Sequence, residues 1–257
     1  MYDLLLYVML VLAAVVFVAL FYFKAGYGYL GGGKWGPCIG NRTAWILMEA
    51  PAFLMMAALA IRYFAYGNGR SGSPVVVGIV AGLFLRHYFQ RSFIFPCLMR
   101  GKGRMPVAIM AMGMLFNCIN AWLIGMWLFE ICPENMYSLR WLGSGYFIVG
   151  TVLFVVGMFI NLQSDHIIRN LRAPGDSAHY IPRKGLYKYV TSANYFGELV
   201  EWCGFAVLAM SPAAFVFAIW TFANLAPRSK ALTEKYIAEF GEEYTSLGKK
   251  NLIPFIW

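Results

Sequence analysis

One glutamate stands inside a long apolar run, where a charged side chain is costly. Glu49 lies in a stretch that contains no other charged residue between Thr43 and Arg62. A charge at bilayer depth costs about 2.5 to 3.5 kcal/mol even on permissive scales, so an acid there indicates a functional site. Pro51 follows two residues later, lacks an amide donor, and is expected to kink the helix and open space beside the acid. We therefore interpret Glu49 as part of a polar chamber inside a membrane.

The third apolar segment carries polar side chains at helical spacing. Phe84, His87, Tyr88 and Arg91 are three or four residues apart and would share one helix face. A tyrosine beside His87 and opposite Glu49 could donate a proton or a hydrogen bond to a ligand. The alternative is that Tyr88 is a packing residue or an interface anchor.

Two more polar stripes fall on the fifth and sixth predicted helices. The fifth helix and its extension carry Asn161, Asp165, Arg169 and Arg172, and the sixth begins with Asn194, Glu198 and Glu201. Each stripe falls on one face of a helix, so two facing stripes would enclose a ligand rich in hydrogen-bonding groups. The alternative is a structural network of buried ion pairs, such as Arg169 with Glu201.

The composition predicts an all-α, multi-pass membrane bundle. Hydrophobic residues make up 60% of the 257 residues and charged residues 13%, against about 25% charged in soluble domains. We expect seven spans, at about 4–23, 44–65, 74–98, 106–130, 140–162, 194–210 and 212–226. The first has no basic leader or cleavage site and is expected to be retained. The last two could form one broken element, and 228–247 is expected to be a separate amphipathic helix. No repeat divides the chain, so residues 1–257 are predicted to form one domain.

Charge sets the expected orientation and partners. The net charge is +9, and most of the 21 lysines and arginines fall in loops on one side of the predicted spans. The positive-inside rule then places the carboxyl terminus and the loop at 163–193 in the cytoplasm. The excess positive charge can orient the protein and anchor it to anionic lipids, or part of it can bind a phosphorylated soluble ligand. The five cysteines contain no CxxC pair and the three histidines are unrelated in spacing, so we expect no metal site.

Five sequence segments carry a family resemblance, which runs from about residue 40 to the end. They lie at 48–53 (MEAPAF), 87–106, 157–175, 180–202 and 252–257 (LIPFIW). With these segments the chain resembles the membrane-embedded steroid 5α-reductases, and we identify it as a bacterial homologue. Relatives that reduce enoyl-thioester or polyprenol double bonds share part of the carboxyl-terminal pattern.

The resemblance implies NADPH-dependent reduction of the Δ4 double bond of a 3-oxo-Δ4-steroid to the 5α-3-oxosteroid. Glu49 and Tyr88 match the pair that contacts the steroid 3-keto oxygen. The positions matching the cofactor side are Asn161, Asp165, Arg172, Asn194, Glu198, Arg100, Arg104, Arg228 and Tyr236. The residues expected to line the steroid are Trp45, Met48, Phe53 and Phe84. The amino-terminal helices would form the substrate side and about 140–257 the cofactor part, with cytoplasmic loops covering NADPH.

Two departures from the family pattern bear on the site. Met48 stands where the family usually has a glutamine, and the segment from Lys230 to Thr233 replaces a histidine cluster near the last cytoplasmic helix. They put in doubt the polarity that faces the steroid and part of the cofactor contact.

A lipid-soluble substrate and an anionic cytosolic reductant suit a pocket with apolar helices on one side and a basic face on the other. Conjugate reduction develops negative charge on the carbonyl oxygen, which a desolvated, neutral Glu49 and Tyr88 could stabilise as hydrogen-bond donors. We expect a monomer in a bacterial inner membrane or an ER-type membrane, in contact with lipid and not with nucleic acid. Three other functions stay open: an enoyl-thioester or polyprenol reductase, an S-adenosylmethionine-dependent membrane methyltransferase, and a non-enzymatic lipid-binding or transport protein.

Overall fold

The computed structural model describes residues 1–23, 28–31, 35–67, 70–100, 103–172, 176 and 178–257. Lys24, Lys34 and Lys102, which contribute to the predicted basic face, lie outside these residues, as do Pro174 and Gly175 of the predicted cofactor-covering loop. The long helices are α1 (Tyr2–Tyr22), α2 (Asn41–Tyr66), α3 (Pro74–Phe89), α5 (Val107–Met126), α6 (Gly145–Arg169), α7 (Ala193–Ala209) and α8 (Pro212–Phe240). The short helices are α4 (Phe95–Leu98) and α9 (Glu242–Thr245).

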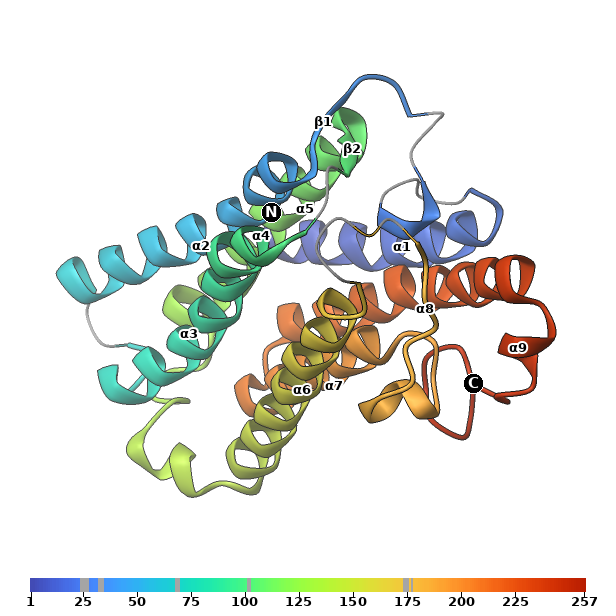
Figure 1. Ribbon diagram of the computed structural model, residues 1–257. Helices are drawn as coiled ribbons and strands as arrows, with labels where there is room; N and C mark the ends of the chain where they lie inside the picture. Colours follow the sequence, from blue (N-terminus) through green and yellow to red (C-terminus); the bar gives the residue numbers. More distant parts are fainter. Residues whose placement is uncertain (24–27, 32–34, 68–69, 101–102, 173–175, 177) are drawn as a thin grey trace.

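Irregular turns extend two of the long helices. A π-helical turn, Gln90–Ile94, joins α3 to α4, and a second one, Trp127–Ile131, continues α5. Short 3₁₀ turns occur at Gly28–Leu30, Leu139–Gly143 and Gly185–Lys188. The described strands β1 (Cys38–Gly40) and β2 (Arg104–Pro106) pair antiparallel, with Ile39 opposite Met105. This small ribbon was not expected from the sequence, and it ties the start of α2 to the start of α5 (Figure 1).

The all-α membrane class is confirmed by the structure, in which each predicted apolar run becomes a helix. Four of the described helices are long and apolar enough to cross a membrane: Tyr2–Tyr22, Asn41–Tyr66, Val107–Ile131 and Gly145–Arg169. The other three of the seven predicted spans are not among these four helices, so the count of seven stays a prediction.

Two expectations about helix boundaries were wrong. The predicted span at 212–226 and most of the amphipathic segment at 228–247 form the single helix α8, which continues through Pro227. Helix α6 extends to Arg169, so the loop expected at 163–193 begins only after that residue, and Arg172 lies beyond the helix. In both cases backbone hydrogen bonding continues past the point where the apolar pattern predicted an end. Helix α2 continues through Pro51, and the kink expected there stays a prediction.

Helices α6 and α7 lie against each other with their backbones in contact (Figure 1). A Cβ atom on Gly157 would lie 2.2 Å from the backbone nitrogen of Glu201, and one on Gly197 would lie 2.5 Å from that of Asn161. Only glycine allows this approach, because real Cβ atoms do not come so close to backbone. The contact brings the polar stripes of the two helices together.

Candidate active site

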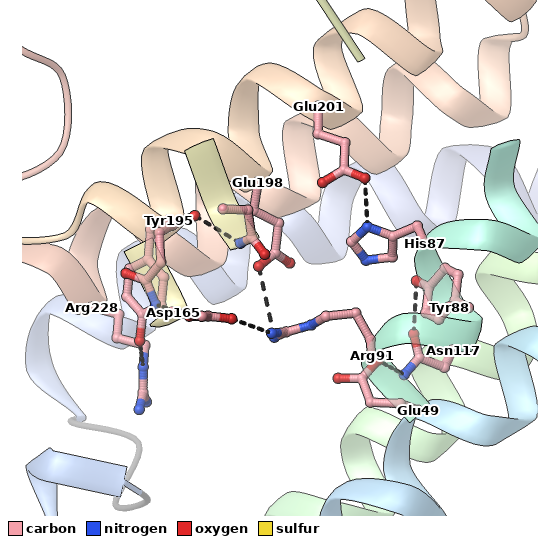
Figure 2. A network of polar contacts seen from close by, with 12 residues as sticks. Glu49, His87, Tyr88, Arg91, Asn117, Asp165, Tyr195, Glu198, Glu201 and Arg228 are labelled. Carbon is pink, nitrogen blue, oxygen red and sulfur yellow. Dashed lines mark hydrogen bonds and ion pairs between the residues drawn. The ribbon is translucent and has the colours of Figure 1, made fainter. Parts of the chain in front are cut away.

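A buried asparagine connects Glu49 with Tyr88 (Figure 2). The Tyr88 hydroxyl donates to Asn117 Oδ1 at 3.2 Å, and Asn117 Nδ2 lies 3.3 Å from Glu49 Oε2. The same Nδ2 donates to the Met48 carbonyl at 2.7 Å. Three helices, α2, α3 and α5, each supply one member of this group, and Tyr88 and Asn117 are 3% and 5% exposed. The structure thus brings together the two predicted catalytic side chains through a residue that the sequence interpretation did not select.

Arg91 occupies the centre of a group of carboxylates and aromatic rings. Its guanidinium lies 3.4 Å from Asp165 and 3.8 Å from Glu198. The same group lies over the rings of Trp45 and Phe95, at 5.0 and 4.6 Å from their centroids. Arg91 falls in the π-helical turn after α3, a distortion that is frequent at functional sites because it changes the direction of side chains. Two ion pairs and two cation–π contacts fix this one cation between α3, α6 and α7.

The two polar stripes on α6 and α7 meet as predicted. Asn194 Nδ2 donates to Asp165 Oδ1 at 3.2 Å, and Asn161 Nδ2 donates to the Asn194 carbonyl at 2.9 Å. Glu198 joins the same group through Arg91. These side chains form one continuous polar surface of amide and carboxylate groups.

Glu201 has a different partner from the one weighed in the sequence analysis. Its Oε1 lies 2.7 Å from His87 Nδ1, and the Glu201 and His87 side chains are 1% and 6% exposed. Arg169, considered there as the partner of Glu201, instead lies at the end of α6 within hydrogen-bond distance of His166. The His87–Glu201 pair adjoins Tyr88 and Trp202 in the core, where the rings of His87 and Trp202 are 4.5 Å apart.

The three remaining predicted cofactor arginines with described contacts have different partners, and Arg228 lies at the edge of the network in Figure 2. Arg100 donates to the Arg169 carbonyl at 3.3 Å, whereas Arg104 donates to the Cys38 carbonyl of the strand pair. Arg228 Nε lies 2.6 Å from the hydroxyl of Tyr195, which belongs to α7. Arg100 therefore adjoins the end of α6, Arg228 adjoins α7, and Arg104 is tied to the ribbon.

Tyr236 lies near Arg172. Tyr236 belongs to the part of α8 that follows the predicted span at 212–226, and Arg172 follows the end of α6. The Tyr236 ring stacks on Tyr244 with centroids 5.1 Å apart and planes 10° apart. Burial raises the pKa of Tyr236 to about 12, and the nearby Arg172 guanidinium acts in the opposite direction. Arg172 itself is exposed, so its cation is available to a soluble anion near this aromatic stack.

The four residues expected to line the steroid have different surroundings. Phe84 is fully buried and packs 4.6 Å from the Tyr88 ring, so it supports Tyr88 from the core. Met48 is buried beside Gly113, Trp45 packs on Phe95, and the Phe53 ring lies 5.9 Å from that of Phe89.

Asn117 is the functional residue that the sequence interpretation missed, whereas Arg91 was placed on the polar face of the third segment without a role. Asn117 was visible as a polar side chain in an apolar run, which is the signal that identified Glu49. Asn117 was overlooked because an amide carries no charge.

Comparisons with known proteins identify relatives of the chain. The family model described as 3-oxo-5-alpha-steroid 4-dehydrogenase matches residues 103–257. The chain is 38% identical to mouse 3-oxo-5-alpha-steroid 4-dehydrogenase 1 over 99% of its own length and 96% of the mouse protein. It is 39% identical to the human type 1 protein over 84% of its length and 80% of that protein. It is also 32% identical to Arabidopsis thaliana steroid 5-alpha-reductase DET2, over 93% of its length and 90% of the plant protein.

Proposed function

The chain belongs to the 3-oxo-5-alpha-steroid 4-dehydrogenase family, and on that premise we propose that it reduces the Δ4 double bond of a 3-oxo-Δ4-steroid using NADPH. The protein is an oxidoreductase of steroids that acts on CH–CH bonds. The finer proposal adds the cofactor, the position of the double bond and the residues that act. Its main support is the hydrogen-bonded connection of Glu49 to Tyr88 through Asn117.

In the proposed reaction, negative charge develops on the steroid 3-oxygen as the β-carbon is reduced. Donors aimed at that oxygen in a site without water stabilise the transition state more than the ground state. We assign this role to the Tyr88 hydroxyl and to Glu49 in its neutral, protonated form. Tyr88 is 3% exposed, which keeps water away from its hydroxyl, and Glu49 is half-buried beside it.

The donor set around α6 and α7 fits NADPH. Asp165, Asn194 and Glu198 offer the acceptors and the amide that suit a carboxamide and ribose hydroxyls. Exposed arginines, of which Arg172 is one, offer cations for phosphates. When bound, NADPH would supply the hydride. The residues of α6 and α7 would hold its polar groups beside Arg91. Arg91 would then lie between the bound cofactor and Glu49.

We further propose that the cofactor side faces the cytoplasm and that the substrate enters from the lipid. The basic loops lie on the side of the chain that carries Arg172 and the carboxyl terminus. A steroid is apolar enough to partition into the bilayer, and the helices α2 and α5 expose large apolar side chains there, including Leu54 and Leu115. This arrangement lets the two ligands approach from different media.

The test compares Glu49→Gln and Tyr88→Phe with the matched surface variants Glu130→Gln and Tyr146→Phe. Loss of one oxyanion donor costs roughly 10² to 10³ in turnover, so Tyr88→Phe should fall in that range. Glu49→Gln is a milder change because an amide still donates. The surface variants should keep wild-type turnover, since Tyr146 is 56% exposed and the Glu130 side chain is 43% exposed.

Wild-type turnover of a 3-oxo-Δ4-steroid by folded Tyr88→Phe would contradict the assigned roles. The absorbance of any nicotinamide that co-purifies discriminates among the other functions. A bound reduced nicotinamide excludes the methyltransferase and disfavours transport. Activity on an enoyl thioester or a polyprenol in place of a steroid would identify one of the related reductases.

A further inference from the structure

We propose that Asn117 is a positioning residue that sets the direction of the hydrogen bonds between Glu49 and Tyr88. This inference rests on the proposed function and deepens it. Asn117 lies on α5, opposite both catalytic side chains, and is 5% exposed. Its side chain contacts three partners from two other helices, Tyr88 of α3 and Met48 and Glu49 of α2.

The amide group has only one orientation that satisfies these three partners. The Met48 carbonyl can only accept, so the atom 2.7 Å from it must be Nδ2, and the oxygen must then face Tyr88. With this orientation Asn117 donates to Glu49 Oε2 and accepts from the Tyr88 hydroxyl. Glu49 Oε1 is left to interact with the substrate.

The short bond to Met48 and the longer bonds to the catalytic groups have different roles. The 2.7 Å bond to the Met48 carbonyl anchors it to the backbone of α2, next to Glu49. The bonds of 3.2 and 3.3 Å to Tyr88 and Glu49 are slightly longer than the usual ranges and are therefore weak. A rigid anchor with weak outer bonds holds both side chains in place, yet lets the Tyr88 proton turn to a steroid oxygen at little cost.

A neutral amide also suits the charge of the site. The Arg91 cation already faces several carboxylates, and an aspartate at position 117 would add another next to Glu49. An amide orients Glu49 without adding that repulsion. A protonated aspartic acid would again donate and accept in the same place, so the two forms of such a variant should differ in activity.

The experiment uses Asn117→Leu and Asn117→Asp, with Thr221→Val as a matched control. Thr221 is a buried polar residue of α8 whose hydroxyl bonds to Phe217 in the same helix, so its loss tests general sensitivity to polar deletions. We expect Asn117→Leu to lower kcat by about 10- to 100-fold, because small misplacements of catalytic groups have effects of this size. KM should change by less than about threefold, since the amide acts on the catalytic pair.

Two readouts separate positioning from a structural role. In the Tyr88→Phe background, Asn117→Leu should lower kcat by a smaller factor than it does in the wild type, because the hydrogen bond between Asn117 and Tyr88 is already lost. The activity of Asn117→Asp relative to wild type should rise as pH falls, whereas that of Asn117→Leu should not change with pH. Full additivity with Tyr88→Phe, or parallel pH profiles for the aspartate variant and the wild type, would overturn the inference.

The outcome also distinguishes this inference from the proposed function. If Tyr88→Phe and Glu49→Gln lower turnover but Asn117→Leu does not, only the role of Asn117 fails. If neither catalytic variant lowers turnover, the proposed function fails and the role of Asn117 fails with it.

Discussion

Replacing Arg91 with methionine should destabilise the protein more than any other single loss of an ion pair. The Arg91 side chain is 11% exposed and faces Asp165 at 3.4 Å and Glu198 at 3.8 Å. Methionine keeps much of the volume and can still pack on Trp45. The substitution therefore removes the charge and leaves the buried Asp165 and the partly buried Glu198 without their cation.

The expected magnitude follows from these distances. At an effective dielectric constant of about 20, two unit charges 3.4 Å apart attract by about 5 kcal/mol. Part of this attraction offsets the cost of desolvation, and breaking a buried pair has a net cost of about 3 to 5 kcal/mol. For a chain of this size, 1 kcal/mol shifts Tm by about 2 to 4 °C. Arg91→Met should therefore lower Tm by roughly 6 to 20 °C.

The assay is thermal unfolding of purified protein at one scan rate, with Arg62→Met as the control. Arg62 pairs with Glu130 at 2.7 Å, but these side chains are 61% and 43% exposed. An exposed pair contributes about 0 to 1 kcal/mol, so the control should lose no more than about 4 °C. Neutralising Asp165 and Glu198 as well, by Arg91→Met/Asp165→Asn/Glu198→Gln, should recover part of the loss. Equal shifts for Arg91→Met and Arg62→Met would refute the reasoning.

Three further predictions concern packing, cofactor choice and pH. Gly157→Ala should disrupt the contact between α6 and α7 and lower Tm markedly, whereas Gly82→Ala, where a Cβ meets no atom within 4 Å, should be neutral or slightly stabilising by thermal unfolding. Arg172→Ala should weaken the binding of NADPH more than that of NADH in direct titrations, because a guanidinium pairs with the 2′-phosphate; equal losses would exclude this role. Burial lowers the pKa of Lys249 from 10.5 to about 8, so the unfolded chain binds more protons between these values and wild-type stability should rise with pH across that window. Lys249→Met should lack this rise in paired thermal scans.

The helices could be predicted because lipid-facing segments must be apolar and must satisfy their own backbone groups. The end of α8 could not, because the apolar run stops near 226 while the helix continues to Phe240. Hydropathy indicates which part of a helix contacts lipid or core, and the polar part of α8 keeps its backbone hydrogen bonds all the same. The helix also continues through Pro227, although a proline removes one backbone donor and crowds the preceding turn.

Within the site, spacing identified which residues share a helix face but could not identify their partners on other helices. Asp165 and Asn194 were placed on facing stripes, and they meet. Glu201, by contrast, bonds to His87 and not to Arg169. The choice depends on how closely α6 and α7 approach at Gly157, which no periodicity within one helix reveals.

The charges around Arg91 bear on the form of Glu49 that the proposed reaction needs. Four carboxyl groups influence Arg91 electrostatically: Glu198, Asp165, Glu49 and Glu201. Glu201 already has a partner, since its carboxylate lies 2.7 Å from His87 Nδ1. One guanidinium then remains for three acids, and a poorly solvated site cannot keep two uncompensated negative charges. Glu49 hydrogen-bonds to the neutral Asn117 side chain, whereas Asp165 and Glu198 pair directly with the cation. The acid that holds a proton at least cost is therefore Glu49, which is the form that can donate to a steroid oxygen.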